Sequence, residues 1–268
     1  MSMDTIFKIY VYVITVIMGL VMGSFLNCMA MRISRHESIL GRSHCENCGH
    51  ELGFLDLIPI FSFIFSNGKC RYCGQKISIR YPISEIVSAL VFVLIVKEFW
   101  FTRETIEYLI LASICLAISF CDLEDFTIPN VLIVLGIINR IVFILLGNNI
   151  PSELLNSLIS GLIASVPVLV LSIVMDKILK KDTMGGGDIK LLFMLGLYLA
   201  TTGSTTLTVG LNLVGLLLSC VIGIIFGVIS TKGEKGKAFP FGPSICLGFL
   251  LSLLYGSRIV IWYLSLFA

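Results

Sequence analysis

The sequence has few charged residues and lacks the glycine fingerprints of nucleotide-binding proteins. Only 13% of its 268 residues are charged, whereas 57% are hydrophobic and the mean hydropathy is +1.00. A soluble domain carries roughly a quarter charged residues, so this composition indicates a membrane protein. The net charge of +2 is too small to suggest nucleic acid as a partner. Neither the dinucleotide-binding nor the P-loop glycine pattern is present.

Long apolar runs fill most of the chain and predict an all-α polytopic membrane protein with about eight spans. A spanning helix needs about 20 mostly apolar residues. The third and sixth runs are short, so these helices are expected to be tilted or only partly inserted. The first run has no clear small-residue cleavage site after it, which favours an uncleaved span over a secretory signal. The predicted spans are residues 6–31, 82–101, 106–121, 128–146, 154–175, 187–203, 207–229 and 239–267.

Lys and Arg are concentrated in alternate loops, and this pattern predicts the orientation. Seven of these residues lie in loop 32–80, and further clusters lie in segments 176–190 and 230–238. An excess of Lys and Arg marks the cytoplasmic side of a membrane. Eight spans then place these loops and residues 122–127 in the cytosol and both termini outside. Arg140 is exceptional because it falls inside the fourth apolar run.

Two CxxC pairs in loop 32–80 predict a structural zinc site. The pairs "CENC" and "CRYC" are about twenty residues apart, and each is followed by a glycine that lets a tight turn close. Two disulfides are the alternative, but a loop in the reducing cytosol disfavours them. Four protein ligands leave no open position for chemistry. The predicted ligands are Cys45, Cys48, Cys70 and Cys73, with His44 or His50 as a possible substitute.

Acidic residues are few, and several lie at the predicted cytoplasmic ends of spans. "CDLEDFTIPN" contains Asp122, Glu124 and Asp125, and "MGGGDIK" contains Asp188. A simpler interpretation of Asp188 is that it caps a helix, and a simpler interpretation of Asp122 is that it is an ordinary acid at the membrane interface. Two aspartates from distant segments can instead converge on one water and share a proton, as peptide hydrolysis by an aspartic dyad requires. Spacing alone leaves both interpretations open.

The glycine run before Asp188 predicts a loop that faces a substrate. Gly185, Gly186 and Gly187 remove side chains where a substrate backbone would approach, and they allow hinge motion. We include Lys190 in this predicted substrate loop.

Several motifs resemble those of the type IV prepilin peptidase and N-methyltransferase family. "GGGDIK" is similar to the GxGD signature of intramembrane aspartic proteases, and "DLEDFTIPN" is similar to the partner motif of the prepilin peptidases. "GSFLNCMAMR", the double CxxC loop, "RYPISEIVSAL" and "FPFGP" also resemble family segments and occur in the family's order. The resemblance runs from about Gly23 to Pro243, which is most of the chain.

This resemblance implies a bifunctional enzyme of the bacterial cytoplasmic membrane. Family members cut the basic leader from prepilin-like proteins on the cytoplasmic side, commonly between Gly and Phe. They then methylate the new N-terminus with S-adenosylmethionine. Asp122 and Asp188 would be the catalytic pair, with Asp125 as the rival of Asp122. Residues that match the family's methylation motifs are Gly23, Asn27, Arg32, Gly68 and Glu85.

Two of these methylation residues have simpler interpretations. Glu85 could be a buried acid paired with Arg80, and Gly68 could serve only the turn before Cys70. No Rossmann-type glycine motif is available for the methyl donor, so the donor is expected to bind at the membrane–cytosol boundary.

Two domains are expected: residues 1–101, associated with methylation, and residues 102–268, a six-span aspartic protease. A transporter or channel with a zinc-folded regulatory loop is the alternative, because glycine clusters and intramembrane acids also mark transport paths. No mirrored second copy of "GGGD" or "TIPN" supports it. A membrane scaffold is a third possibility, and it predicts that replacing Asp122 and Asp188 with Asn would have no effect in any assay.

Overall fold

The computed structural model describes residues 3–35, 37–38, 41–180, 184–231 and 239–266. Most of the predicted loop 230–238 and part of segment 176–190 therefore lie outside the described residues. The described chain is helical and forms no β-strand. Its helices are α1 (Met3–Ser34), η1 (Phe54–Asp56), α2 (Phe61–Phe65), α3 (Arg80–Phe99), α4 (Arg103–Asp125), α5 (Asn130–Leu145), α6 (Ile150–Leu179), α7 (Gly186–Gly196), η2 (Leu197–Leu199), α8 (Thr205–Thr231) and α9 (Gly242–Ser265).

Every predicted span falls on a helix, and five helices are long and apolar enough to cross a membrane. These five are α1, α4, α6, α8 and α9, which supports a multi-pass membrane protein. The remaining apolar runs form α3, the shorter apolar helix α5, and α7, which has only 11 residues. The count of eight spans therefore stays a prediction.

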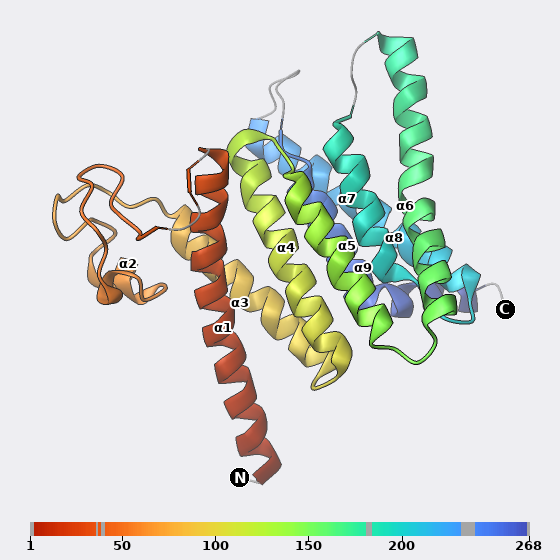
Figure 1. The fold of residues 1–268 in the computed structure, drawn as a ribbon, viewed down its shortest axis with the longest axis horizontal. Helices are drawn as coiled ribbons and strands as arrows, with labels where there is room; N and C mark the ends of the chain where they lie inside the picture. Colours follow the sequence, from red (N-terminus) through yellow and green to blue (C-terminus); the bar gives the residue numbers. More distant parts are fainter. Residues whose placement is uncertain (1–2, 36, 39–40, 181–183, 232–238, 267–268) are drawn as a thin grey trace. The chain divides into compact units, whose positions relative to one another are not determined.

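The chain divides into two compact units, Met1–Phe120 and Cys121–Ala268, and the division falls inside α4. The expected functional boundary between residues 101 and 102 stays a prediction. In the first unit, α1 and α3 cross and pack against each other (Figure 1). A Cβ atom on Gly19 would lie 2.5 Å from the Cα of Ala89. Glycines at such a crossing let two helix backbones approach closely, as is common in membranes.

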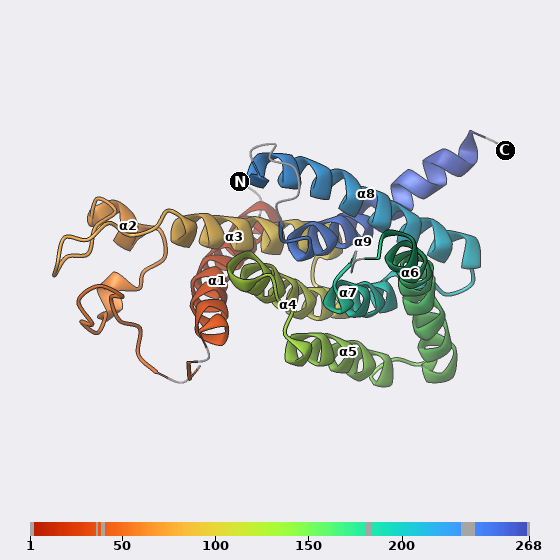
Figure 2. The same cartoon turned by 90° about the horizontal axis from the view of Figure 1, so that it is seen from above.

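In the second unit, α7 is enclosed by α5, α6 and α9 (Figure 2). Its side chains Leu191, Leu192, Met194 and Leu195 are almost completely buried. A helix that is apolar all round is stable only when other elements cover it. The prediction of a helix over 187–203 was wrong at its C-terminal end, because α7 continues only as the short η2.

Hydrogen bonds from neighbouring helices hold the C-terminal end of α7. The hydroxyl of Ser160 donates to the carbonyl oxygen of Gly196 over 2.6 Å, and Ser157 donates to that of Leu197 over 2.5 Å. Asn212 on α8 donates in turn to the Ser160 hydroxyl over 2.9 Å. These bonds satisfy carbonyl groups at the end of α7 and fix the helix against α6 and α8. The opposite end of α7, which contains Asp188, is positioned as a consequence.

Candidate functional site

Asp122 lies in the last turn of α4 and is only 4% exposed. Its Oδ2 accepts a hydrogen bond of 2.8 Å from the backbone N–H of Gly242, the first residue of α9. A Cβ atom on Gly242 would lie 2.8 Å from the same oxygen, so only glycine permits this approach. The carboxylate of Asp122 is thus buried against the N-terminus of another helix.

The position of Asp122 is unfavourable for α4 itself. The last turn of α4 contains Asp122, Glu124 and Asp125 and no basic residue. Acidic groups near a helix C-terminus are destabilised by the helix dipole, whereas a helix N-terminus favours them. The N-terminus of α9 therefore offsets the unfavourable interaction between the Asp122 carboxylate and the C-terminal end of α4. Such an arrangement has no evident benefit for stability, which favours a functional interpretation.

The rival residue Asp125 has different surroundings. It is the last residue of α4 and is exposed. The helix ends there because Phe126 adopts a left-handed φ of 55° and its N–H donates to the carbonyl oxygen of Asp122. Burial therefore distinguishes Asp122 from Asp125.

Asp188 is half-buried in the first turn of α7. Its carboxylate accepts a hydrogen bond from the backbone N–H of Gly185, so it does help to cap the helix. It also lies near enough to Asp122 for the two negative charges to repel each other. A carboxylate has about four acceptor sites, so capping leaves sites free for a water or a substrate. The structure therefore brings together the two aspartates that the sequence singled out.

The three glycines before Asp188 have different surroundings, and none has a positive φ. A Cβ atom on Gly187 would lie 3.2 Å from Cβ of Ile128, so Gly187 packs against the segment between α4 and α5. A Cβ atom on Gly186 would meet nothing within 4 Å. Lys190 donates a hydrogen bond of 3.0 Å to the side-chain oxygen of Asn130 at the start of α5. The loop is therefore anchored on one side and open at Gly186.

The four predicted zinc ligands form one cluster in the first unit. The sulfur atoms of Cys45, Cys48, Cys70 and Cys73 all lie within 4.8 Å of one another, and no disulfide joins them. Each CxxC pair forms the same turn, in which the glycine N–H donates to the carbonyl oxygen of the first cysteine. Gly49 and Gly74 have φ values of 70° and 74°, which explains the glycine after each pair.

The geometry of this cluster fits tetrahedral zinc. Zn–S bonds of about 2.3 Å place the sulfur atoms about 3.8 Å apart, and the sulfur atoms of Cys45 and Cys73 are 3.8 Å apart. The backbone N–H of Gln75 and the side-chain amide of Asn47 lower the pKa of Cys73 to about 6. Hydrogen bonds from the backbone of Cys48 and Asn47 likewise lower the pKa of Cys45. Neither His44 nor His50 belongs to the cluster.

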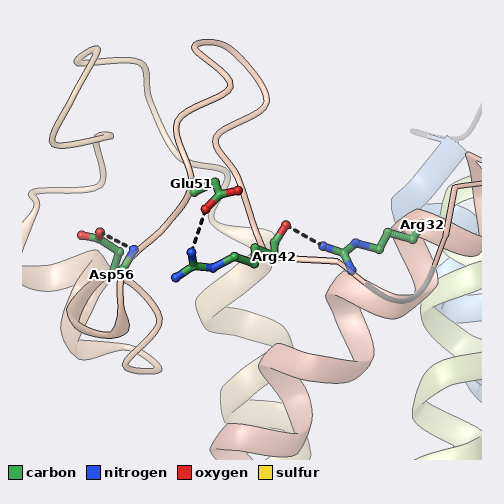
Figure 3. Close-up of polar contacts among 5 residues, drawn as sticks. Arg32, Arg42, Glu51 and Asp56 are labelled. Carbon is green, nitrogen blue, oxygen red and sulfur yellow. Dashed lines mark hydrogen bonds and ion pairs between the residues drawn. The ribbon is translucent and has the colours of Figure 1, made fainter.

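A cavity of about 760 Å³ lies in the first unit beside the zinc cluster. It is enclosed by the C-terminal half of α1, the start of α3 and the loop between them, and this volume is typical of small-molecule sites. Arg32 on α1 donates to the carbonyl oxygens of Gly41 and Arg42. Figure 3 shows its contact with Arg42, whose own side chain pairs with Glu51. Arg32 therefore holds one wall of this cavity in place.

Of the five residues assigned to methylation by resemblance, some line this cavity and others do not. Arg32 and Glu85 line the cavity, whereas Gly23, Asn27 and Gly68 do not. A Cβ atom on Gly23 would lie 2.8 Å from the Cα of Glu85, and Gly68 is a turn residue with a φ of 65°. Asn27 is buried on α1. Among the described residues, Glu85 is bonded to Ser24 and Ile60 and forms no ion pair with Arg80.

Sequence reasoning missed two residues at these sites. Gly242 was part of the quoted "FPFGP" segment, but nothing in the sequence indicated its contact with a residue 120 positions away. Ile60 donates its backbone N–H to Oε2 of Glu85 over 2.7 Å. Its φ of 61° is rare for a β-branched residue, and no turn glycine marked the position.

Two family descriptions match the chain. "Bacterial Peptidase A24 N-terminal domain" matches residues 17–99, and "Type IV leader peptidase family" matches residues 109–228. A "Prepilin leader peptidase/N-methyltransferase" of Bacillus subtilis (strain 168) is 31% identical over 93% of this chain and 96% of its own length. A protein of the same description from Aeromonas salmonicida (strain A449) is 32% identical over 86% of this chain and 77% of its own length. No solved structure gives a significant match.

Proposed function

Because the chain belongs to the type IV leader peptidase family, as its motifs indicated, we propose that it removes the basic leader from prepilin-like proteins. The observation that carries this proposal is the convergence of Asp122 and Asp188 from α4 and α7 within one compact unit. Family membership favours a peptidase over the alternative of a transporter or channel.

In the proposed mechanism the two aspartates act as a dyad. Two nearby carboxylates cannot both ionise cheaply, so they share one proton. The ionised carboxylate takes a proton from a water molecule, which then attacks the scissile carbonyl carbon. The protonated partner donates to the carbonyl oxygen and stabilises the charge that develops there. The Gly242 N–H fixes Asp122 in position, and the open space at Gly186 gives the substrate backbone access.

The proposed site lies at the cytoplasmic membrane surface. The C-terminal end of α4 and the N-terminal ends of α7 and α9 meet around Asp122, so these helix ends share one side of the second unit. Under the eight-span topology, the Lys- and Arg-rich loops lie on that same side. A leader that emerges into the cytosol would then meet the dyad where it leaves the membrane.

The second proposed activity is methylation of the new N-terminus in the cavity of the first unit. S-adenosylmethionine would supply a methyl group that is activated by a positively charged sulfur. The cavity volume of about 760 Å³ and its mixture of charged and apolar walls fit such a ligand. Met29 and Tyr81 provide apolar surface, and Lys69 and Lys76 are cations that suit the carboxylate of the donor.

Zinc at the four cysteines is proposed as the structural core of the loop. The loop has little buried apolar surface, since Cys70 is its only buried hydrophobic residue among those that the structure describes. Small domains of this kind depend on a metal for their fold. The zinc cluster therefore supports the walls of the cavity.

A processing assay tests both activities. The purified protein in lipid is mixed with a prepilin that bears a basic leader and a Gly-Phe junction, and the products are weighed by mass spectrometry. We expect loss of the leader and, with S-adenosylmethionine, a gain of one methyl group on the mature product. An uncut substrate under conditions in which a family relative cuts it would contradict the proposal.

A further inference from the structure

Glu85 is a buried carboxylate on the wall of the cavity in the first unit. It is 6% exposed. Its carboxylate accepts hydrogen bonds from the Ile60 backbone N–H and from the Ser24 hydroxyl on α1. Neither donor is charged, and no ion pair among the described residues includes Glu85. A buried carboxylate with this environment is costly unless a cation joins it.

The other acids of the cavity differ from Glu85 in this respect. Glu46 pairs with Arg35 at 2.9 Å, and Glu37 also interacts electrostatically with Arg35. Asp56 lies 3.4 Å from Arg71. All three acids belong to the loop, where Lys and Arg are abundant. Of the acids that line the described part of the cavity, Glu85 is therefore the one whose negative charge a bound cation could balance.

The backbone at Ile60 is strained in a way that serves Glu85. Ile60 has a φ of 61° and a ψ of −51°, which β-branched residues avoid. This conformation directs its N–H to Oε2 of Glu85 over 2.7 Å. Strained residues of this kind persist where the surrounding structure requires them, and they cluster at functional sites.

The cation that best fits this place is an amine attached to an apolar residue. The α1 wall of the cavity includes the apolar side chains Val21, Phe25 and Met29. Arg32 also lies on α1, but its guanidinium is bonded to the loop, and the other basic side chains of the cavity lie on the loop itself. The methyl donor has a carboxylate of its own and suits the basic wall. The N-terminal ammonium of a processed prepilin, which begins with an apolar residue in the proposed reaction, suits Glu85.

We infer that Glu85 binds the α-ammonium group of the processed substrate and removes its proton before methyl transfer. This inference rests on the proposed methyltransferase function. In the step, one N–H bond of the ammonium breaks, its electron pair stays on nitrogen, and the proton forms an O–H bond with Glu85. The neutral amine then has the lone pair that a methyl acceptor needs.

The test compares wild type with Glu85→Gln on α3 and with Glu51→Gln, a control in the loop between α1 and α3 that does not line the cavity. Binding is measured for a short peptide with the mature prepilin N-terminus, with its amine either free or acetylated. Methylation of mature product, supplied already cut, is measured from pH 6 to pH 9. Binding of S-adenosylmethionine is measured separately, and zinc content confirms that each variant is folded.

We expect wild type and Glu51→Gln to bind the free amine at least about 10-fold more tightly than the acetylated peptide, and Glu85→Gln to lose this preference. An α-amino group has a pKa of about 7.7–8.0, so roughly a tenth of it is neutral at pH 7. Methylation by Glu85→Gln should therefore fall at least about 10-fold at pH 7 and recover toward pH 9. Its binding of S-adenosylmethionine should stay within about twofold of wild type.

Two results would overturn the inference. One is a Glu85→Gln protein that keeps the amine preference and the wild-type pH profile. The other is a loss of S-adenosylmethionine binding as large as the loss of methylation, which would assign the carboxylate to the donor. If wild type neither binds S-adenosylmethionine nor methylates, the proposed second activity is wrong, and the amine preference alone then decides the role of Glu85.

Discussion

At the residue scale, the candidate dyad depends on contacts that leave little space for change. Asp122 is held by the backbone of Gly242, and Asp188 is held by that of Gly185. Backbone N–H groups are rigid donors, so they fix the carboxylates more firmly than mobile side chains would. The most informative single substitution is therefore at a glycine next to an aspartate.

Replacing Gly242 with Ala should reduce cleavage roughly 100-fold, because a displacement of about 1 Å at a catalytic group has this effect. The added Cβ would lie 2.8 Å from Oδ2 and 3.2 Å from Cγ of Asp122, so the carboxylate or α9 must move. The measurement is the cleavage rate per folded molecule.

The matched control for this substitution is Gly248→Ala on the same helix. Its Cβ would crowd the side chain and backbone of Ser219 on α8, so the substitution is similarly tight but does not touch Asp122. We expect Gly248→Ala to lower thermal stability and to retain most of the cleavage rate. Equal rate losses in both variants would show that Gly242 matters only for helix packing.

At the element scale, the first unit depends on the crossing of α1 and α3 and on the zinc-binding loop between them. Replacing Gly19 with Leu inserts a side chain where the Cβ alone would lie 2.5 Å from the Cα of Ala89. Overpacking of this kind costs about 1–3 kcal/mol, or more when backbone must move. We expect a lower unfolding temperature in lipid for Gly19→Leu. Met18→Leu, at a half-exposed neighbouring position, should leave it unchanged, and equal effects would argue against a tight crossing.

The zinc site gives a second prediction at this scale. Wild type should contain about one zinc ion per chain, and Cys73→Ser should lose most of it, because a tetrahedral structural site needs four ligands. Metal analysis of the purified protein measures this. Cys220→Ser is the control, since Cys220 is an exposed cysteine on α8 outside the cluster. Retention of zinc by Cys73→Ser, or its absence from wild type, would be evidence against the site.

The sequence predicted the elements better than it predicted their ends. Each predicted apolar run falls on a helix in the structure. These runs were predictable because composition alone identifies long apolar segments. The α7 helix stops at Gly196, although residues 187–203 were expected to be helical. The Ser160 hydroxyl on α6, itself held by Asn212 on α8, donates to the carbonyl oxygen of Gly196 in place of a further helical turn. The zinc ligands were predictable from local spacing. The Gly242 and Ile60 contacts were not, since they join segments that are distant in the sequence or depend on a strained backbone.

At the scale of the whole molecule, the predicted topology places the zinc loop and the proposed dyad on the same side of the membrane. The predicted topology places residues 147–149 on the opposite side. An epitope tag inserted after Asn148 should be reached by antibody on intact bacterial spheroplasts. A tag after Phe65 in the zinc loop should be reached only after the membrane is opened. Equal access to both tags from outside would contradict the eight-span topology.

The proposed mechanism requires Asp122 and Asp188 to act together on the substrate. The most direct measurement is the cleavage rate of wild type, Asp122→Asn, Asp188→Asn and Asp125→Asn with one prepilin substrate. We predict that the first two variants lose at least about 100-fold in rate. They should remain folded, because Asn has the shape of Asp and its side-chain oxygen can still accept the backbone hydrogen bond. Asp125→Asn, exposed at the end of α4, should cut at nearly the wild-type rate. Full activity in either the Asp122 or the Asp188 variant would contradict the dyad.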